Sequence, residues 1–220
     1  MVNLSQIELY PNAVSQEQCQ FLIDLIDTVK TTDDSSLKIH DRSCLKIHDR
    51  PGKQSTDLYC NFADTLSEEQ HPIFKQTNDI LYPVLETLCY HYKIAFPFLN
   101  KISPWKLHNW YNLQYYSEGQ GYSALHSEHD SVYTCEHKKI HKITADRMLV
   151  WMIYLNDAEC GTHFPAQEIT IQPQAGLGVI WPAFWTHPHQ GVTPNIGDKY
   201  IATGWFSFYD PFMKVAPGHD

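Results

Sequence analysis

The segment FWTHPHQGVTPNIGDKYIATGW, residues 184–205, decides how the C-terminal half of the chain is organised. Its middle part, TPNIGD, is rich in turn-forming residues, and the residues from Lys199 onward have the composition of a β-strand. Because side chains alternate across a strand, Lys199, Thr203 and Trp205 are expected on one side of it. The segment therefore predicts a strand that presents an amine and a large aromatic ring on the same face.

Metal-capable side chains cluster in GYSALHSEHDSV, residues 121–132. On an extended backbone His126 and Glu128 point the same way, and Asp130 would replace Glu128 if the register shifted. A lone cluster of this kind is most often a polar surface loop, so a metal site requires another imidazole from a distant segment. The C-terminal segment offers two candidates, His187 and His189.

Two histidines and one carboxylate on one face of an ion form the ligand set of non-haem Fe(II) oxygenases. Three adjacent positions stay open, and they accept the ketone and carboxylate of a 2-oxo acid and O₂. Such a cosubstrate also has a distal carboxylate, which needs a cation or strong donors where it is desolvated. Lys199 is the candidate cation, and its alternative is a solvated charge at the edge of a sheet.

Two helices and a series of strands are predicted around these segments. Apolar residues at helical spacing predict helices over 16–30 and 72–92, the first with a capping box of Ser15 and Gln18. Helices followed by antiparallel strands at short spacing indicate an α+β protein in which the helices buttress a β-sandwich or barrel. The predicted strands are 105–116, 122–128, 147–155, 168–173, 177–181 and 199–209.

A six-residue unit, LKIHDR, occurs twice, at 37–42 and 45–50. Two copies are too few for a solenoid. Alternating apolar residues on either side of the polar residues 41–44 favour a small hairpin between the copies, with a flexible surface insertion as the alternative. His40 and His48 are expected to be exposed rather than to bind a metal.

Composition limits the class of protein. A chain of 220 residues fits one domain, and 16 Lys and Arg against 25 Asp and Glu give a net charge of −9, which disfavours a nucleic-acid partner. Six scattered cysteines without a CxxC pair indicate reduced thiols and a cytoplasmic location. No apolar run approaches the roughly 20 residues that cross a bilayer, and no export signal is recognisable, so no membrane partner is expected.

Short motifs follow one another in a fixed order between Tyr116 and Trp205. They read Tyr116-x-x-Gly119-x-x-Tyr122, His126-x-Glu128, Thr162-x-Phe164-Pro165, and His189 with Lys199 ten residues later and Trp205 six beyond that. Their order and spacing over ninety residues resemble the catalytic barrel of the Fe(II)/2-oxoglutarate dioxygenases, within them the prolyl 4-hydroxylase-like group. The spacing to Lys199 favours His189 over His187, which would then line the rim or hydrogen-bond a ligand.

The chain departs from the family pattern in three respects. Glu128 stands where the family has Asp, which moves the carboxylate outward by roughly 1.5 Å, and an extra residue before His126 suggests a compensating bulge. Glu159 and Cys160 replace the usual glycine pair before the threonine motif. No ligand type is lost, and the retained carboxylate favours hydroxylation, because halogenating relatives give up that ligand.

The resemblance implies a double-stranded β-helix, or jelly-roll, barrel buttressed by N-terminal helices. It implies a dioxygenase that hydroxylates a C–H bond while 2-oxoglutarate is decarboxylated to succinate, with Fe(II), O₂ and ascorbate as a potential reductant. The implied iron ligands are His126, Glu128 and His189. The implied 2-oxoglutarate residues are Lys199, Tyr116, Thr162 and Trp205, and the implied substrate contacts are Tyr122 and Arg147, whose alternative roles are a core aromatic and a surface charge.

The whole chain, 1–220, is expected to form a single catalytic domain. Residues 1–104 would supply helical support and a flexible insertion, and 105–210 the jelly-roll core. The expected partner is a peptide or small-molecule substrate, with specificity set by loops 31–57 and 131–146. The alternatives are a non-catalytic, metal-binding, cupin-like module and a nucleic-acid demethylase of the same superfamily. The retained ligand set argues against the first and the acidic charge against the second.

Overall fold

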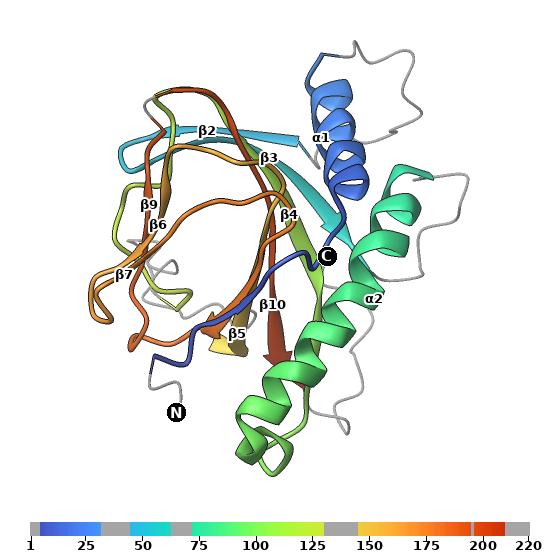
Figure 1. Cartoon of the computed structure of the whole chain (residues 1–220), viewed down its shortest axis with the longest axis vertical. Helices are drawn as coiled ribbons and strands as arrows, with labels where there is room; N and C mark the ends of the chain where they lie inside the picture. The colour runs from blue at the N-terminus through green and yellow to red at the C-terminus, as the bar shows by residue number, and fades with distance from the viewer. Residues whose placement is uncertain (1–4, 32–44, 63–71, 130–144, 195, 210–220) are drawn as a thin grey trace, which may run out of the picture.

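Two β-sheets face each other, and two helices cover the outer face of the larger sheet (Figure 1). The computed structural model describes residues 5–31, 45–62, 72–129, 145–194 and 196–209. Within these residues no helix is long and apolar enough to cross a membrane. The helices are α1 (Gln16–Thr31), α2 (Pro72–Ala95) and the short 3-10 helix η2 (Pro97–Asn100).

The larger sheet has seven strands in the order β1-β8-β5-β10-β4-β3-β2, and the smaller has three in the order β7-β6-β9. The paired strands are antiparallel. This arrangement confirms the predicted α+β jelly-roll with supporting helices. The strands are β1 (Glu8–Tyr10), β2 (Leu45–Arg50), β3 (Lys53–Asn61), β4 (Trp105–Tyr116), β5 (Arg147–Tyr154), β6 (Gly161–Phe164), β7 (Ile169–Ile171), β8 (Gly178–Pro182), β9 (Gln190–Val192) and β10 (Lys199–Phe208).

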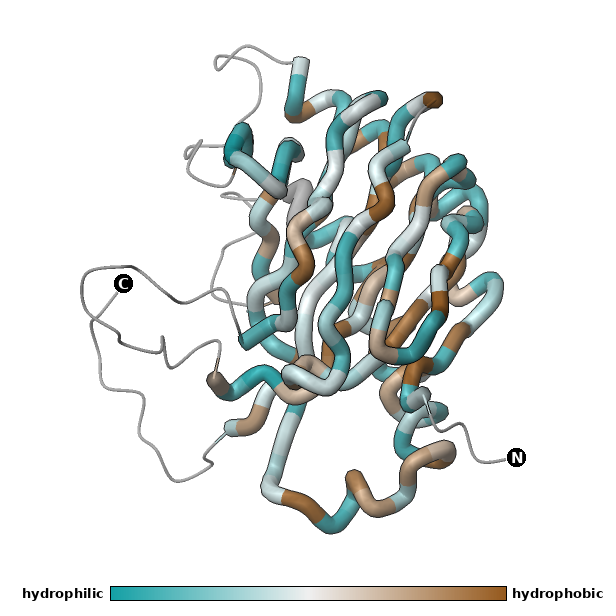
Figure 2. Tube along the Cα trace, turned by 90° about the vertical axis from the view of Figure 1, so that its left-hand side faces the viewer, coloured by the Kyte–Doolittle hydropathy of each residue, from teal (hydrophilic) through white to brown (hydrophobic). Residues whose placement is uncertain are grey.

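Strand β5 lies at the centre of both hydrophobic clusters. Leu149 and Trp151 join the cluster between the larger sheet and the helices, whereas Val150 and Met152 join the cluster between the two sheets. Because both faces of this strand are covered, it is apolar from Met148 onward, after its first residue, Arg147. Along the strands seen from the side of the smaller sheet, hydrophilic and hydrophobic residues alternate (Figure 2). The cavity between the sheets is lined by both apolar and polar residues.

Helix α1 begins at the predicted capping box. The Ser15 backbone N–H donates to Gln18 Oε1 at 3.0 Å, and the Gln18 N–H donates to Ser15 Oγ at 3.1 Å. Leu22 and Ile26 are buried on its inner face. The helix predicted over 72–92 is also present and extends to Ala95. Both helices bury their apolar stripes against the larger sheet.

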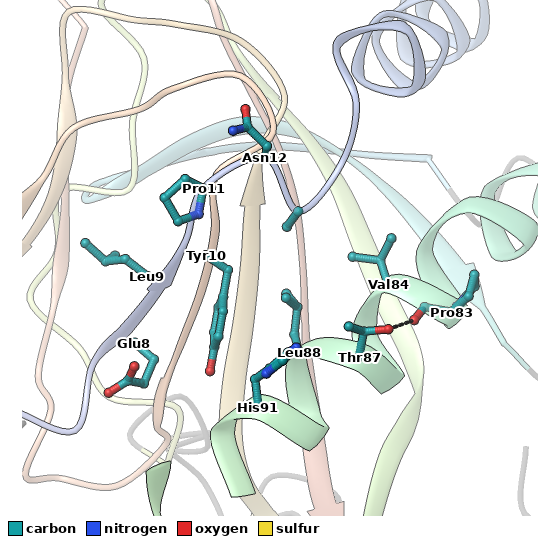
Figure 3. A pocket seen from close by; sticks show the side chains of 11 residues that line it. Glu8, Leu9, Tyr10, Pro11, Asn12, Pro83, Val84, Thr87, Leu88 and His91 are labelled. Carbon is teal, nitrogen blue, oxygen red and sulfur yellow. Dashed lines mark hydrogen bonds between the residues drawn. The ribbon is translucent and has the colours of Figure 1, made fainter. Parts of the chain in front are cut away.

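Helix α2 leaves a groove where it passes β1 (Figure 3). The groove has a volume of about 650 Å³, and Tyr10, Leu88 and His91 point into it. Pro83 lies inside the helix, and its carbonyl accepts a hydrogen bond from Thr87 Oγ1 at 2.9 Å. The groove shares no lining residue with the cavity between the sheets, so it is a separate surface feature.

The strand predicted over 122–128 is wrong. The segment is irregular and makes only an isolated antiparallel bridge, between His126 and His189. Its backbone groups are divided between two neighbours: the Ala124 N–H donates to Gly52 O at 3.1 Å, whereas His126 pairs on the other side. These single contacts do not continue into a ladder with either neighbour, so the segment is not a strand.

The hairpin predicted between the two LKIHDR copies stays a prediction. The first copy lies outside the described residues, and the second forms β2, which pairs with β3 around Pro51 and Gly52. Gly52 has a φ of 84°, a left-handed conformation that glycine adopts without a steric penalty. Strand β3 was not predicted because the face that it buries carries Lys53, Ser55 and Asp57, which removes the apolar alternation. The short strands β1, β6 and β9 were missed as well.

Replacing Leu85 with Ala should lower the free energy of unfolding by about 2–5 kcal/mol, because this side chain is fully buried between α2 and the larger sheet. Ile94→Ala is the matched control: it lies on the same helix but is 60% exposed, so it should cost less than about 0.5 kcal/mol. Urea denaturation followed by circular dichroism measures both. Equal losses would contradict the docking of α2 described above.

Candidate metal centre

The bridge between His126 and His189 brings the two candidate ligand segments together. The His126 N–H donates to His189 O at 3.0 Å, and the His189 N–H donates back to His126 O at 2.8 Å. With Glu128, these residues place one ligand atom each within 4.8 Å of one another. Ligand atoms about 2.1 Å from one ion lie up to about 4 Å apart, so this triad can close around an ion with a small adjustment.

Both imidazoles have Nδ1 hydrogen-bonded to a backbone carbonyl and Nε2 available to a metal. Nδ1 of His126 lies 2.8 Å from Ala124 O, and Nδ1 of His189 lies 3.1 Å from His187 O. A carbonyl oxygen only accepts, so each Nδ1 carries the proton and each Nε2 keeps a free lone pair for a metal. Burial, followed by the neighbouring His126, lowers the pKa of His189 to about 4, which keeps its ring neutral.

The structure places His189, not His187, beside the carboxylate. The ring of His187 is engaged elsewhere: its Nε2 donates to Ser5 O at 2.8 Å, and its Nδ1 lies 2.9 Å from Thr186 Oγ1. Its contribution to the triad is its backbone carbonyl, which fixes the orientation of the His189 ring. Of the two roles expected for His187, lining the rim or hydrogen-bonding a ligand, the structure shows the second, made by its backbone.

The two oxygens of Glu128 have different surroundings. Oε2 accepts hydrogen bonds from Trp205 Nε1 at 2.7 Å and from Arg147 at 3.1 Å, whereas Oε1 lies 3.6 Å from His189 Nε2. Burial alone would raise the pKa of this carboxyl, but Arg147, the two imidazoles and the Trp205 hydrogen bond outweigh it, and the net pKa is lowered. One oxygen is therefore anchored and the other is available, ionised, to a metal.

Arg147 forms an ion pair with Glu128, one of the three candidate metal ligands. Its guanidinium carbon lies 3.5 Å above the centre of the Trp205 ring, and its side chain is 13% exposed. Cation–π contact and ion pairing hold the group in place. The alternative of a solvated surface charge is wrong for this residue, since it lines the cavity and pairs with Glu128.

A cavity of about 270 Å³ opens between the sheets beside the triad. Lys199, Thr203 and Trp205 all line it, as the alternation along their strand predicts. Lys199 is only 5% exposed, and no carboxylate of the described residues lies within 4.0 Å of its amine. Burial lowers the pKa of Lys199. A buried amine without an anion beside it is suited to bind an anionic ligand.

The other predicted cosubstrate residues also line the cavity. The Tyr116 hydroxyl donates to Gln114 Oε1 at 2.9 Å, and its ring centre lies 5.5 Å from the Lys199 amine. Thr162 accepts a hydrogen bond from Tyr154 at 2.7 Å, so its own proton stays available to a ligand. Tyr122 stacks on the His126 ring with centres 3.8 Å apart, which makes it a neighbour of the metal centre.

A polar network on β3 was missed by the sequence reasoning. Asp57 is fully buried and accepts hydrogen bonds from Lys53 at 2.7 Å, Ser55 at 2.8 Å and Gln114 at 2.9 Å. His48, expected to be exposed, has a side chain only 21% exposed, with Nε2 3.3 Å from the same carboxylate. The one available signal was the alternation of Lys53, Ser55 and Asp57, which share a face only on a strand. Because no strand was predicted there, the signal did not indicate a buried network.

Two imidazoles and one carboxylate, set in a jelly-roll cavity that also holds a buried lysine, are the arrangement that non-haem iron oxygenases of the 2-oxo-acid-dependent class use. Residues 111–207 match the family model described as the 2OG-Fe(II) oxygenase superfamily. The resemblance predicted from the motifs is thereby confirmed. No curated protein sequence matches the chain.

Solved structures of prolyl hydroxylases share the fold. The viral collagen prolyl hydroxylase vCPH of Paramecium Bursaria Chlorella virus-1, in complex with 2-oxoglutarate, has a TM-score of 0.57 and 18% identity, covering 95% of this chain and 99% of its own. A prolyl-4-hydroxylase of Pseudomonas putida gives 0.56 and 12%, covering 95% and 96%. A prolyl hydroxylase of Trichoplax adhaerens, bound to a hypoxia-inducible-factor peptide, gives 0.63 and 10%, covering 94% and 85%. At these identities the likeness establishes the fold alone.

The two neighbouring histidines allow a matched test of the metal ligand. His189→Ala should weaken Fe(II) binding by more than the roughly 10–100-fold that the loss of a hydrogen-bond partner of a ligand costs. His187→Ala should leave affinity nearly unchanged, because the ring of His187 bonds to Ser5 and only its backbone reaches the triad. Anaerobic calorimetry with Fe(II) measures both. Stronger loss in the His187 variant would reverse the assignment.

Removing the charge of Arg147 should shift the pH range of metal binding upward. Arg147 lowers the pKa of Glu128, so Arg147→Met raises that pKa and the carboxyl stays protonated, and unable to bind iron, up to a higher pH. Fe(II) affinity measured anaerobically as a function of pH should therefore decline at a higher pH than in the unmodified protein. Arg147→Lys, which keeps the charge, should shift the profile less. Superimposable profiles would contradict the role of Arg147.

Proposed function

We propose that the protein is an Fe(II)- and 2-oxoglutarate-dependent dioxygenase that hydroxylates a C–H bond of a peptide or small-molecule substrate, in the manner of the prolyl hydroxylases. The observation that carries the proposal is the pairing of an open His126, Glu128 and His189 triad with the buried amine of Lys199 in one cavity. A metal-binding module has no use for that amine. The net charge of −9 also disfavours nucleic-acid substrates.

The chain's own residues account for binding and orientation. The triad would hold iron on one side, and the anchored Oε2 of Glu128 keeps its other oxygen directed at the ion. Lys199, with Tyr116 and Thr162 beside it, would hold the distal carboxylate of 2-oxoglutarate by charge-assisted hydrogen bonds. Iron and 2-oxoglutarate, when bound with O₂, supply the oxidant that replaces a substrate hydrogen by a hydroxyl group and leave succinate and CO₂.

The cavity walls protect the reaction from competing chemistry. Val150, Met152 and Trp181 line the cavity beside the polar residues and belong to the core between the sheets. They exclude water and limit the volume near the metal, so that only one C–H bond of the substrate comes close to the oxidant. Ascorbate would serve as the reductant that returns iron to the ferrous state after turnovers without substrate.

Lys199→Met separates cosubstrate binding from metal binding. Protein prepared anaerobically with Fe(II) should form succinate from 2-oxoglutarate slowly when O₂ is admitted, even without substrate. The variant should need a far higher 2-oxoglutarate concentration, because losing one partner of a buried charge pair costs about 2–5 kcal/mol, or roughly 30-fold or more. Its Fe(II) affinity should stay unchanged. Calorimetry gives both affinities, and a coupled assay gives succinate.

Two results would contradict this function. Succinate formation that is the same in the unmodified protein and in His189→Ala would show that the triad does not drive the reaction. Equal losses of Fe(II) and 2-oxoglutarate affinity in the Lys199 variant would show that this lysine supports the whole site rather than one carboxylate. Lys101→Met, an exposed lysine on another part of the chain, is the matched control.

A further inference from the structure

Strand β2 carries basic side chains that the proposed reaction does not use. Lys46, His48 and Arg50 alternate along it and share one face. His48 and Arg50 line the cavity beside the metal centre. The amine of Lys46 lies 4.8 Å above the ring of Tyr59, another lining residue. The second LKIHDR copy therefore places a row of basic groups at the entrance of the candidate active site.

Positive charge exceeds negative charge around this cavity. Its charged lining residues are Arg50, Lys53, Arg147 and Lys199 against one carboxylate, Glu128. Arg147 is neutralised by Glu128, and Lys53 by the buried Asp57 behind the wall. Two charges on iron and two on 2-oxoglutarate would cancel, which leaves Lys199 at the buried end of the cavity. Arg50 remains, together with Lys46 further along β2.

These two basic groups have no acidic partner in the part of the chain that the structure describes. No Asp or Glu carboxylate there lies within 4.0 Å of the Lys46 amine or the Arg50 guanidinium, and both residues are exposed. In a chain with a net charge of −9, a row of basic residues at a site entrance is a local exception. It supplies attraction to an anion where the overall charge supplies none.

The position of β2 relative to the metal centre is fixed by backbone hydrogen bonds. Gly52, at the tip of the hairpin, accepts from the Ala124 N–H at 3.1 Å, and the Gln54 N–H donates to Gly121 O at 2.8 Å. Both contacts are made to the segment that carries His126. A Cβ on Gly52 would meet the Cβ of Ala124 at 2.7 Å, so the two segments touch. The basic face is thus held at a set distance from the reacting position.

The spacing of the basic groups favours an extended ligand. A strand rises about 3.3 Å per residue, so Lys46 and Arg50 are roughly 13 Å apart, too far for one small acid to contact both. An extended peptide with acidic side chains at alternate positions has the matching repeat. The cavity volume of about 270 Å³ is below the 300–1,000 Å³ typical of sites that enclose a whole ligand, so most of a substrate must lie outside.

We propose that β2 docks an acidic, extended segment of a peptide substrate, with Arg50 as the contact at the cavity entrance and Lys46 as the contact further out. This inference rests on the proposed function and specifies its substrate class. The residue to be hydroxylated enters the cavity, and acidic side chains beside it pair with β2. Because these contacts are near the surface, they should weaken as salt concentration rises.

Three labelled peptides of equal length test the proposal. Each has a single central proline, and the flanking positions carry Glu, Gln or Lys. Binding to protein loaded anaerobically with Fe(II) and 2-oxoglutarate is followed by fluorescence anisotropy, and hydroxylation on admitting O₂ by mass spectrometry. The Glu peptide should bind about tenfold or more tightly than the Gln peptide, and the Lys peptide most weakly. Arg50→Glu should reduce the preference for Glu and improve binding of the Lys peptide.

Lys101→Glu is the matched control, since it makes the same charge change at an exposed position outside the cavity. It should leave the ranking of the peptides unchanged, and circular dichroism confirms that both variants fold. Equal binding of the Glu and Gln peptides, no binding of any peptide, or a Glu preference that survives Arg50→Glu would overturn the proposal. Free glutamate that competes as well as the whole Glu peptide would overturn the extended binding mode.

Succinate formation distinguishes a failure of the docking role of β2 from a failure of the proposed dioxygenase activity. If the unmodified protein forms succinate from 2-oxoglutarate but shows no charge preference among peptides, only the docking role of β2 is rejected. If it forms no succinate with Fe(II), 2-oxoglutarate and O₂, the proposed function fails and the docking proposal fails with it.

Discussion

A reciprocal pair of backbone hydrogen bonds between His126 and His189 is the constraint on which the candidate site depends. It joins an irregular segment after β4 to the start of β9, and so places two imidazoles from distant parts of the sequence side by side. Since the pairing uses only backbone groups, the two imidazole side chains remain available to bind a metal. Carbonyl groups of Ala124 and His187 then bind Nδ1 of each ring and direct each Nε2 inward. The ligand geometry is therefore built before any metal arrives.

Two buried charges divide the cavity into a metal end and an anion end. At the metal end the desolvation of Glu128 is offset by Arg147 and by the indole of Trp205, which occupy one oxygen and leave the other accessible. At the anion end Lys199 has aromatic rings of Tyr116 and Tyr154 nearby but no carboxylate among the described residues. An uncompensated buried amine is costly in an empty cavity and favourable in one that holds an anion. A dianionic cosubstrate would therefore place one end on a metal held by the triad and the other on Lys199.

The parts of the structure that could be predicted are those whose conformation depends on residues close together in the sequence. The capping box of Ser15, the alternation along β10 and the motif spacing that selects His189 all follow from neighbours in the sequence. The failures share a physical cause. Strand β3 buries Lys53, Ser55 and Asp57, so it lacks the apolar alternation of a half-buried strand, whereas the segment 122–128 was predicted as a strand and makes only an isolated bridge. Such features depend on partners that only the folded chain supplies.

The buried carboxylate of Asp57 connects the part of the cavity that His48 lines to the part that Tyr116 and Lys199 line. Burial alone would raise the pKa of Asp57, but contacts with His48, Lys53 and Ser55 outweigh it and the net pKa is lowered. The same carboxylate accepts from Gln114, whose Oε1 in turn accepts from the Tyr116 hydroxyl beside Lys199. Losing one of these donors would leave the buried carboxylate poorly compensated, so the contacts favour one arrangement of the strands that carry them. Through this network Asp57 contacts His48 of β2, Lys53 of β3 and Gln114 of β4. The basic strand and the residues around Lys199 are therefore connected through the same carboxylate.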